Sequence, residues 1–566
     1  MGRAERMGAR DPLLRLLLAW LVATSVACLV VRQVFAISVH PPTRVIASVW
    51  RGGEKMARAV LAHAGDHDPT LDAALATNPA TGTLVYEAPV GEGPVLVHPE
   101  AAFAMSFVPG TDGVAATIGD RTEYLTPDDL RSRQAYDKGI ELTSLGFKAG
   151  VDVQLVLALF ADAFAITVPD LMERAHFERF RVVRSVSGEH PKVPVQPDTL
   201  TDAAVRDAAL AAARFLARGV DGQGRFRYMV DATTNRTLAG YDWPRHAGAT
   251  YFLAQAAGLS SDRLIGDAAL RAAGWLRDHA LVDCGPNRCV GDQGIVDVGS
   301  SALGLIAFVE VARAKLDVGY ADLVSGLAAF LRAQQRPDGE FMHQYDREAG
   351  HPIDIQLLYY SGEAALALSR AASLSGDPGD RDAASRALAH LVGPGWSFFG
   401  SRYYFGEEHW TCQAMEDLWD VAPDRRALDF CVRWQAYNRR LQYGPGDSPY
   451  DADGAYGFGP LVTPRLTPVG SRCESGIATL DALGRASSGS AADAAELARL
   501  RDQMRRSLAL LLRHQVGAGS IPLYLLAVPD AVVGAMPASE VDWQLRIDFA
   551  QHTGSALIRW LSRPRG

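Results

Sequence analysis

With 566 residues, the chain is too long for one ordinary hydrophobic core, and we expect two or three domains. Its 48% hydrophobic and 8% aromatic residues are typical of a folded protein, not of a disordered one. A net charge of −9 without a basic stripe argues against nucleic acid as the main partner.

The N-terminus carries a targeting signal. Arginines precede the apolar run LLLAWLVATSVACLVV, which reaches the roughly 20 residues of a membrane span if Arg32 extends to the outer interface. Basic flanks stay in the cytoplasm, so we expect residues 1–39 to be a cytoplasmic stub and transmembrane signal anchor. The bulk of the chain would then face the periplasm or the extracellular side. A cleaved signal peptide and a lipoprotein signal ending at Cys28 are the alternatives.

Residues 40–196 are predicted to form a small α+β domain that ends in a Pro-rich linker. The segments GTLVYEAP, GPVLVHPE, GVAATIGD and RFRVVRSV are short apolar runs and predict strands. TPDDLRSRQAYDKGIEL predicts a helix, with Thr126 and Asp128 as capping candidates. No motif here indicates chemistry, so we expect a scaffold or a docking module for an envelope protein partner.

Residues 197–566 alternate between two kinds of helix. Amphipathic helices with a charged face are expected at 202–218, 262–279, 320–335, 380–391, 425–440 and 492–514. Each precedes a helix of small and apolar residues, expected at 246–258, 298–313, 361–372, 409–421, 474–485 and 549–561. A helix without a polar face must be covered on every side. Six such pairs predict hairpins closed into a ring with the apolar helices inside, although an open solenoid would show a similar pattern.

This repeat plan, together with the motifs YYSGEAALAL and RIDFAQHTGSAL, resembles the α/α-toroid superfamily. That superfamily includes six-hairpin glycosidases, N-acylglucosamine 2-epimerase-type enzymes, α/α-barrel polysaccharide lyases and, more distantly, lanthionine and terpenoid cyclases. The expected fold is therefore mainly α: a six-hairpin α/α toroid with a small N-terminal α+β domain and an N-terminal transmembrane helix. Such folds host many unrelated reactions, so the chemistry has to come from the site.

One mouth of such a ring is built from the loops that lead into the inner helices, and ring closure would point their polar residues into one cavity. A glycoside hydrolase needs two carboxylates there, whereas a lyase or epimerase needs a Tyr or His base and a charge-neutralising Arg. The expected catalytic residues are Tyr359, Glu363, Glu408, His409, Glu474 and Asp548. The expected substrate-binding residues are Arg245, His246, Asp297, Tyr360, Arg472, Arg546 and His552.

Some of these residues also have a structural explanation. Asp297, Glu474 and Asp548 stand at predicted helix starts, where a carboxylate can accept hydrogen bonds from unpaired backbone amides. Glu363 is different, because it lies in the first turn of a helix of Ala, Leu and Gly, where an unpaired carboxylate is costly. The loop YGPGDSPYDADGAYGFGPLVTPRL fits either a carbohydrate groove or a plain surface loop.

The possible disulfides of this chain are consistent with export to an oxidising compartment. Cys284 and Cys289 flank a Gly-Pro turn that could bring them within disulfide reach. His409 and Cys412 are one helical turn apart and Cys473 precedes the next inner helix, so the three could bind a catalytic zinc ion. A Cys412–Cys473 disulfide and free buried thiols are the alternatives. No other metal or cofactor is expected.

The sequence thus predicts an exported, membrane-anchored carbohydrate-active enzyme, a glycoside hydrolase, lyase or epimerase that acts on a polysaccharide or oligosaccharide in the toroid mouth. The alternative is a non-catalytic glycan-binding or assembly protein of an envelope polysaccharide system. A zinc-dependent toroid cyclase or transferase is the third interpretation. Two unpaired carboxylates in the cavity would favour an enzyme, whereas acids locked in salt bridges beside aromatic platforms would favour a binding protein.

Overall fold

The computed structural model describes residues 37–77, 82–142, 147–188, 194–292, 294–394, 408–448, 450–457, 462–487, 489–517 and 521–563. The chain divides into two compact units, one of residues 1–190 with 460–462 and one of residues 191–459 with 463–566. The predicted membrane anchor lies outside the described residues apart from its last three positions. Elsewhere in the described part no single helix is long and apolar enough to span a bilayer; only the bent pair α5 (Val153–Phe164) and α6 (Val168–Arg174) meets those criteria jointly.

The first unit contains an antiparallel sheet with the strand order β3-β2-β4-β9-β5-β6 and with β1 paired to β4. The strands are β1 Ser38–Val39, β2 Val45–Arg51, β3 Glu54–Leu61, β4 Thr83–Pro94, β5 Asp112–Ile118, β6 Arg121–Leu125 and β9 His176–Val186. A separate hairpin joins β7 (Tyr136–Leu142) to β8 (Phe147–Val151), and α2 (Pro69–Ala76), α3 (Glu100–Ala104) and α4 (Pro127–Ser132) complete the unit with α5 and α6. Mixed helices and strands agree with the predicted α+β class.

Two local predictions in this unit are wrong. The helix expected over TPDDLRSRQAYDKGIEL begins as predicted, with Thr126 and Asp129 forming a capping box, but it ends at Ser132. Left-handed backbone at Gln134 and Asp137 breaks it, and the chain continues as β7. The segment GPVLVHPE is not a strand of its own, because β4 ends at Pro94.

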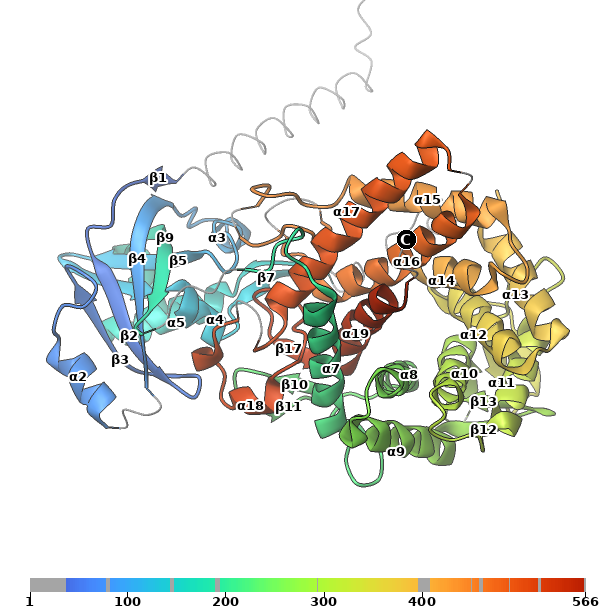
Figure 1. Cartoon of the computed structure of the whole chain (residues 1–566). Coiled ribbons are helices and arrows are strands. Elements are labelled where there is room, and N and C mark those ends of the chain that lie inside the picture. Colours follow the sequence, from blue (N-terminus) through green and yellow to red (C-terminus); the bar gives the residue numbers. More distant parts are fainter. Residues whose placement is uncertain are drawn as a thin grey trace, which may run out of the picture. The chain divides into compact units, whose positions relative to one another are not determined.

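The second unit is a closed ring of six helical hairpins (Figure 1). The outer helices are α7 Asp202–Arg218, α9 Arg263–Ala280, α11 Ala321–Gln334, α13 Pro378–Leu391, α15 Arg425–Arg439 and α17 Ala491–His514. The inner helices are α8 Trp243–Leu259, α10 Val298–Arg313, α12 Tyr360–Ser375, α14 Glu408–Leu418, α16 Leu466–Ala486 and α19 Ile547–Ser562. Each inner helix packs on the next, and α19 packs on α8. The predicted α/α toroid is therefore confirmed and the open solenoid is excluded.

Small residues allow the inner helices to approach closely. In α10, every residue from Val298 to Val311 is buried, as expected for a helix covered on all sides. A Cβ added at Gly554 of α19 would lie 2.0 Å from the Phe252 ring of α8. Glycine at that contact lets the two helices that close the ring pack against each other.

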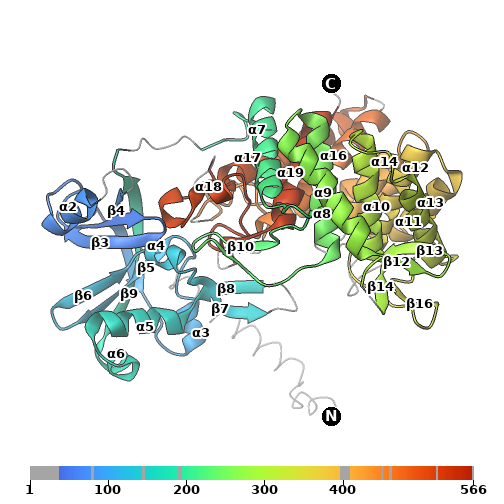
Figure 2. The ribbon, with the colours of Figure 1, turned by 90° about the horizontal axis from the view of Figure 1, so that it is seen from below.

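Short strands lie beside the ring of helices (Figure 2), and two of them lead directly into the N-terminal ends of inner helices. The strand β10 (Met229–Asp231) pairs with β11 (Arg236–Thr237) and with β17 (Gln544–Arg546), which runs directly into α19. Likewise β14 (Ile295–Asp297) runs into α10 and pairs with β15 (Gln344–Asp346), which in turn pairs with β16 (His351–Ile353). Ladder hydrogen bonds thereby hold the first residues of α10 and α19 in place.

Two disulfides stabilise the ring. The predicted Cys284–Cys289 bond is confirmed and links β12 (Leu281–Cys284) to β13 (Asn287–Val290). The second bond joins Cys412 of the inner helix α14 to Cys431 of the outer helix α15. A single turn of 3-10 helix at Leu523–Leu525 and α18 (Pro529–Val532) lie between α17 and β17.

Candidate active site

Three inner helices bring His409, Glu474 and His552 together. Nδ1 of His552 lies 2.8 Å from Oε2 of Glu474, and the two imidazole rings have their centroids 5.7 Å apart. One ligand-type atom from each of the three side chains lies within 4.8 Å of the other two. We call His409 and His552 the histidine pair. All three residues are among those predicted to converge at the mouth.

Buried groups surround this cluster. The Tyr251 hydroxyl donates to Oε1 of Glu474 over 3.4 Å, and Gln551 donates in turn to that hydroxyl. Glu474 is 1% exposed and is therefore shielded from water. The Trp410 ring lies 4.3 Å from the His409 ring and 5.7 Å from the His552 ring, between centroids. The histidine pair thus lies in a surrounding of low polarity, where hydrogen bonds and charges act strongly.

Glu363, in the first turn of α12, is a buried acid at this mouth. Its Oε2 has no hydrogen-bond partner among the residues that the structure describes. Burial, with a further contribution from the nearby carboxylate of Asp297, raises its pKa to about 8. Glu363 therefore carries a proton at neutral pH. Gly299 leaves room for this side chain, since a Cβ there would lie 2.6 Å from Oε2 of Glu363 and 2.5 Å from the Tyr360 ring.

Asp548 is locked between two arginines. Arg546 donates from Nε to Oδ1 over 2.6 Å and from Nη2 to Oδ2 over 2.9 Å, and Arg245 donates to Oδ2 over 3.4 Å. Burial alone would raise the pKa of Asp548, but the hydrogen bonds and charge of Arg546, with the charge of Arg245, lower it. Arg245 is also bound by Asp242. Asp548 is therefore ionised, and its oxygens are occupied.

Tyr359 has an unusual backbone conformation next to the histidine pair. Its φ is 80°, in a region that residues other than glycine rarely adopt, and its ring centroid lies 6.0 Å from that of His409. The following residue, Tyr360, contacts His343 with ring centroids 5.5 Å apart. Backbone strain of this kind gathers at functional sites, and the role predicted for this junction stays a prediction.

Several predicted site residues lie elsewhere. His246 is fully buried, with its ring nitrogens bonded to the Tyr241 hydroxyl and to the carbonyl of Ala272 in the outer helix α9. Arg472 is also fully buried; it donates to the carbonyl of Pro468 and stacks over the Tyr456 ring. Neither joins the cluster around the histidine pair. The side chain of Glu408 lies outside the described residues.

The capping explanation holds for one of the three acids. Asp297 caps α10 and accepts a hydrogen bond from the Ser300 amide over 2.6 Å. For Glu474 the explanation is wrong, because α16 begins at Leu466 and Glu474 lies two turns inside it. Asp548 stands in the first turn of α19 but accepts from arginine side chains.

The predicted zinc ligands are wrong as a set. Cys412 is bonded to Cys431 of α15, so it faces the outer ring and neither ligates a metal with His409 nor pairs with Cys473. Cys473 is a buried thiol whose pKa burial raises. Among the described residues, the group that could hold a metal ion is His409, Glu474 and His552.

The acids of the Gly- and Tyr-rich loop have structural partners. Arg513 binds Asp451 with a shortest contact of 2.7 Å, and Arg506 binds Asp453 over 2.9 Å. The carbohydrate-groove interpretation of this loop therefore gains no support from them.

The sequence interpretation missed two groups beside the site. Tyr251 and Gln551 hold Glu474 from the interior of α8 and α19, where the only signal is a polar side chain in an otherwise apolar helix. Buried Glu340 accepts from Ser361 at the start of α12 and contacts His390 over 3.2 Å, which anchors that helix from the turn before β15.

No family model matches the chain, and no curated protein matches it. Solved structures with a similar fold include a D-mannose isomerase, 11% identical over 64% of this chain and 96% of that chain, with a TM-score of 0.48. A sugar epimerase from a ruminal bacterium is 11% identical over 65% and 100%, with a TM-score of 0.49. An unsaturated glucuronyl hydrolase specific for heparin is 12% identical over 64% and 97%, with a TM-score of 0.43. With identities of 11–12% and TM-scores below 0.5, these similarities carry no conclusion about substrate or reaction.

Proposed function

We propose that the protein is a carbohydrate-active enzyme that transfers a proton at a sugar carbon next to a carbonyl group, as an epimerase or isomerase. The observation that carries the proposal is the histidine pair, with the Glu474 carboxylate 2.8 Å from one of its rings. Histidine exchanges protons near neutral pH, and a buried carboxylate orients it and stabilises its charged form. Two imidazoles with their ring centroids 5.7 Å apart supply both an acid and a base.

The reaction follows from that arrangement. In the open-chain form of an aldose, the proton on C2 is acidic because the neighbouring C1 carbonyl delocalises the charge left behind. The neutral imidazole removes this proton, the C2 electron pair forms an enediolate, and the other imidazole, initially charged, returns a proton. Return to the opposite face of C2 gives the 2-epimer, whereas return to C1, together with transfer of the proton of the C2 hydroxyl to O1, gives the ketose. Glu474 holds His552 in position throughout.

Hydrolysis has less support, because it needs two carboxyl groups free to act on the glycosidic bond. Glu363, which is neutral, could serve as the general acid, but the second carboxylate is lacking among the described residues, because Asp548 is bound by two arginines and Glu474 by His552. Arg245 and Arg546 are likewise occupied, which disfavours a uronate and favours a neutral sugar.

A non-catalytic sugar-binding protein is the second candidate. The observation that favours it is the locked Asp548, since acids held in salt bridges are expected of a binding protein. Aromatic rings at the start of α8 would supply the platform: the Tyr241 centroid lies 5.2 Å from Tyr228 and 5.9 Å from Trp243.

We also propose export and membrane anchoring. The basic and apolar N-terminal segment supports the anchor, and the two disulfides support an oxidising compartment. An envelope polysaccharide and a protein partner of the first unit would then be encountered there. Fractionation of cells that express the full chain tests this: protein in the cytoplasmic fraction with reduced cysteines would contradict export.

The test of activity is proton exchange. The purified protein is incubated in D2O with reducing aldohexoses, N-acetylhexosamines and β-linked disaccharides, and NMR follows deuterium at C2 and the appearance of the epimer or ketose. His409→Asn and His552→Asn should each lower the rate by roughly 10² to 10⁴-fold. His351→Asn is the matched control, because His351 is exposed on β16. No exchange with any sugar, together with saturable binding that survives both site substitutions, would overturn the enzyme in favour of the binding protein.

A further inference from the structure

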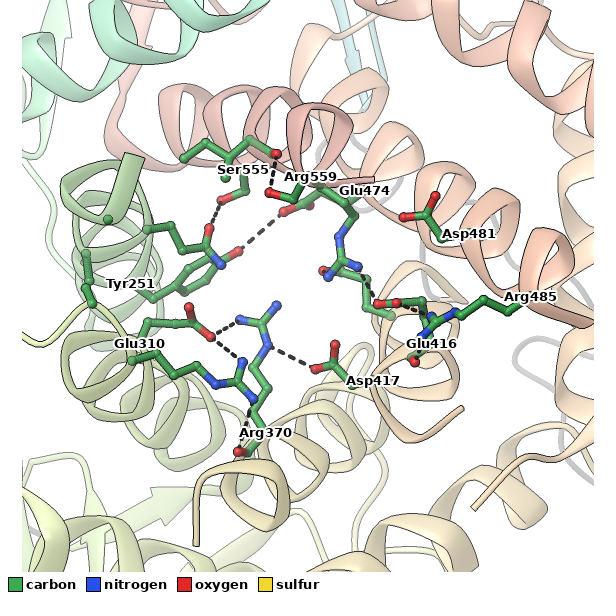
Figure 3. A pocket seen from close by; sticks show the side chains of 18 residues that line it. Tyr251, Glu310, Arg370, Glu416, Asp417, Glu474, Asp481, Arg485, Ser555 and Arg559 are labelled. Carbon is green, nitrogen blue, oxygen red and sulfur yellow. Dashed lines mark hydrogen bonds and ion pairs between the residues drawn. The ribbon is translucent and has the colours of Figure 1, made fainter. Parts of the chain in front are cut away.

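A pocket of about 490 Å³ lies among the C-terminal halves of the inner helices and extends to Glu474 of the candidate active site. All six inner helices contribute to it, mostly through residues of their C-terminal halves, such as Glu310, Arg370, Asp417, Asp481 and Arg559 (Figure 3). Glu474 and Tyr251 line it as well, so the pocket reaches two of the residues described beside the histidine pair. Pockets of this size hold small organic ligands.

Every arginine of this pocket already has a carboxylate partner. Arg370 contacts Glu310 over 3.4 Å and Asp417 over 3.3 Å. The other three arginines are paired in the same way: Arg313 with Glu310, Arg559 with Glu416, and Arg485 with Glu416 and Asp420. An anionic ligand would have to displace one of these buried partners, which is costly.

Two polar groups of the pocket, the Asp481 carboxylate and Nε2 of Gln413, have no hydrogen-bond or ion-pair partner in the described part of the chain. Asp481 makes no ion pair or hydrogen bond there; burial and the charge of Glu416 raise its pKa to about 6, against the opposing charges of Arg559, Arg485 and Arg563. Gln413 is 1% exposed, and its Nε2 donates to no group, while its Oε1 accepts from Arg559. A buried donor without an acceptor costs free energy that a ligand can recover.

The electrostatics favour a cation. The lining includes five carboxylates against four guanidinium groups, one negative charge in excess. The inner helices also end on this side, and the C-terminus of a helix carries a partial negative charge. An ammonium group has three donors and no acceptor, which suits a carboxylate that makes no direct ion pair or hydrogen bond.

We propose that this pocket is a second ligand site, which binds a small hydroxylated amine of the amino-sugar class. The ammonium group lies at Asp481, and a hydroxyl oxygen of the ligand accepts a hydrogen bond from Nε2 of Gln413. One or two sugar rings fill the volume. The proposal does not depend on the reaction at the histidine pair.

The test measures binding in a background that separates the two sites. Calorimetry at neutral pH compares glucosamine, glucose and N-acetylglucosamine on the full chain carrying His409→Asn and His552→Asn. We expect glucosamine to bind at least tenfold more tightly than the other two sugars, since only glucosamine carries an ammonium group. Asp481→Asn should weaken glucosamine binding by about tenfold, as expected for loss of a charge-assisted hydrogen bond.

A blocking variant provides the second measurement. Gly258 lines the pocket, and a Cβ there would meet only the Ala314 Cβ at 3.9 Å, so Gly258→Phe should fold and abolish binding. Asp267→Asn, at an exposed position of α9, is the matched control and should bind as the parent does. Equal affinity for glucose and glucosamine, or glucosamine binding that survives both Asp481→Asn and Gly258→Phe, would overturn the proposal. Glucosamine binding without any proton exchange by the unsubstituted chain would leave the second site standing and overturn only the proposed reaction.

Discussion

Replacing Glu363 with glutamine should flatten the pH dependence of the toroid's stability. The folded state holds the pKa of Glu363 at about 8, against an ordinary value of 4.5. Between these values the folded protein binds a proton that the unfolded chain has released, so stability falls as the pH rises through this window. From about pH 5 to about pH 7.5 the loss is about 3 kcal/mol, at 1.36 kcal/mol for each unit of pKa difference. Glutamine has the same shape and no proton to lose, so this loss disappears.

The assay is the thermal midpoint of unfolding between about pH 5 and pH 8.5. Groups other than Glu363 titrate in both proteins, so only the difference between wild type and Glu363→Gln is used. That difference should grow by a few degrees with rising pH, in favour of the variant. Glu348→Gln, at an exposed position, is the control and should follow the wild type. Parallel curves for wild type and Glu363→Gln would refute the raised pKa and with it the assignment of Glu363 as a neutral acid.

Three further predictions concern the metal-capable group, the second disulfide and the helix packing. Zn²⁺ should bind the histidine pair with Glu474, because two imidazoles and a carboxylate suit zinc, and it should block proton exchange. After gel filtration, Glu474→Gln should retain less zinc than the wild type. A chelator should restore the wild-type rate of exchange. Joint replacement of Cys412 and Cys431 by alanine should lower the free energy of unfolding by about 3 kcal/mol, as urea titration would show, because the bond closes a loop with a sequence separation of 19. Gly554→Ala should lower the free energy of unfolding by about 1–3 kcal/mol, since its Cβ would overlap the Phe252 ring. Gly484→Ala, whose Cβ would have nothing within 4 Å, should not destabilise the protein. Equal melting temperatures for the two variants would contradict the close packing at Gly554.

The ring of helices could be predicted because its two kinds of helix differ in pattern. The outer helices show a polar face with the helical period, and α7 spans 202–218 as predicted. The inner helices are apolar all round, and α10 spans 298–313 as predicted. Local propensity and burial agree in these segments, so sequence pattern alone is sufficient.

The start of α16 could not be predicted from such patterns. Pro468 and Gly470 indicate a break, and the helix was expected to begin at residue 474, but it begins at Leu466. Proline is tolerated in a first turn, where its missing amide would have no partner in any case. Gly470 is required by tertiary packing, because a Cβ there would lie 2.9 Å from the backbone of His552. The error hid the fact that Glu474 faces His552 from two turns inside its helix.

The pairing of Cys412 could not be predicted either, because spacing along the chain does not reveal which face of an inner helix a residue occupies. Position alone placed Cys412 and His409 one turn apart, which suits a shared ligand site. In the ring, Cys412 meets Cys431 of the neighbouring outer helix, while His409 meets His552. Only the closed arrangement of the helices shows that Cys412 points to the outer helix and His409 to the neighbouring inner helix.

The charged residues in the C-terminal halves of the inner helices show which buried acids of the pocket have ion-pair partners. Glu310, Arg370 and Asp417 form one buried ion-pair network across three helices. Such a network needs no ligand to be satisfied, and burial of complete pairs is the ordinary way for a protein to keep charges in its interior. Asp481 departs from this arrangement, because it is the acid of this pocket that makes no direct ion pair within the described residues, although the charges of Arg559, Arg485 and Arg563 act on it. The same reasoning distinguishes Glu363 from Asp548 at the mouth: a buried acid with its partners explains the fold, and a buried acid without them calls for a proton or a ligand.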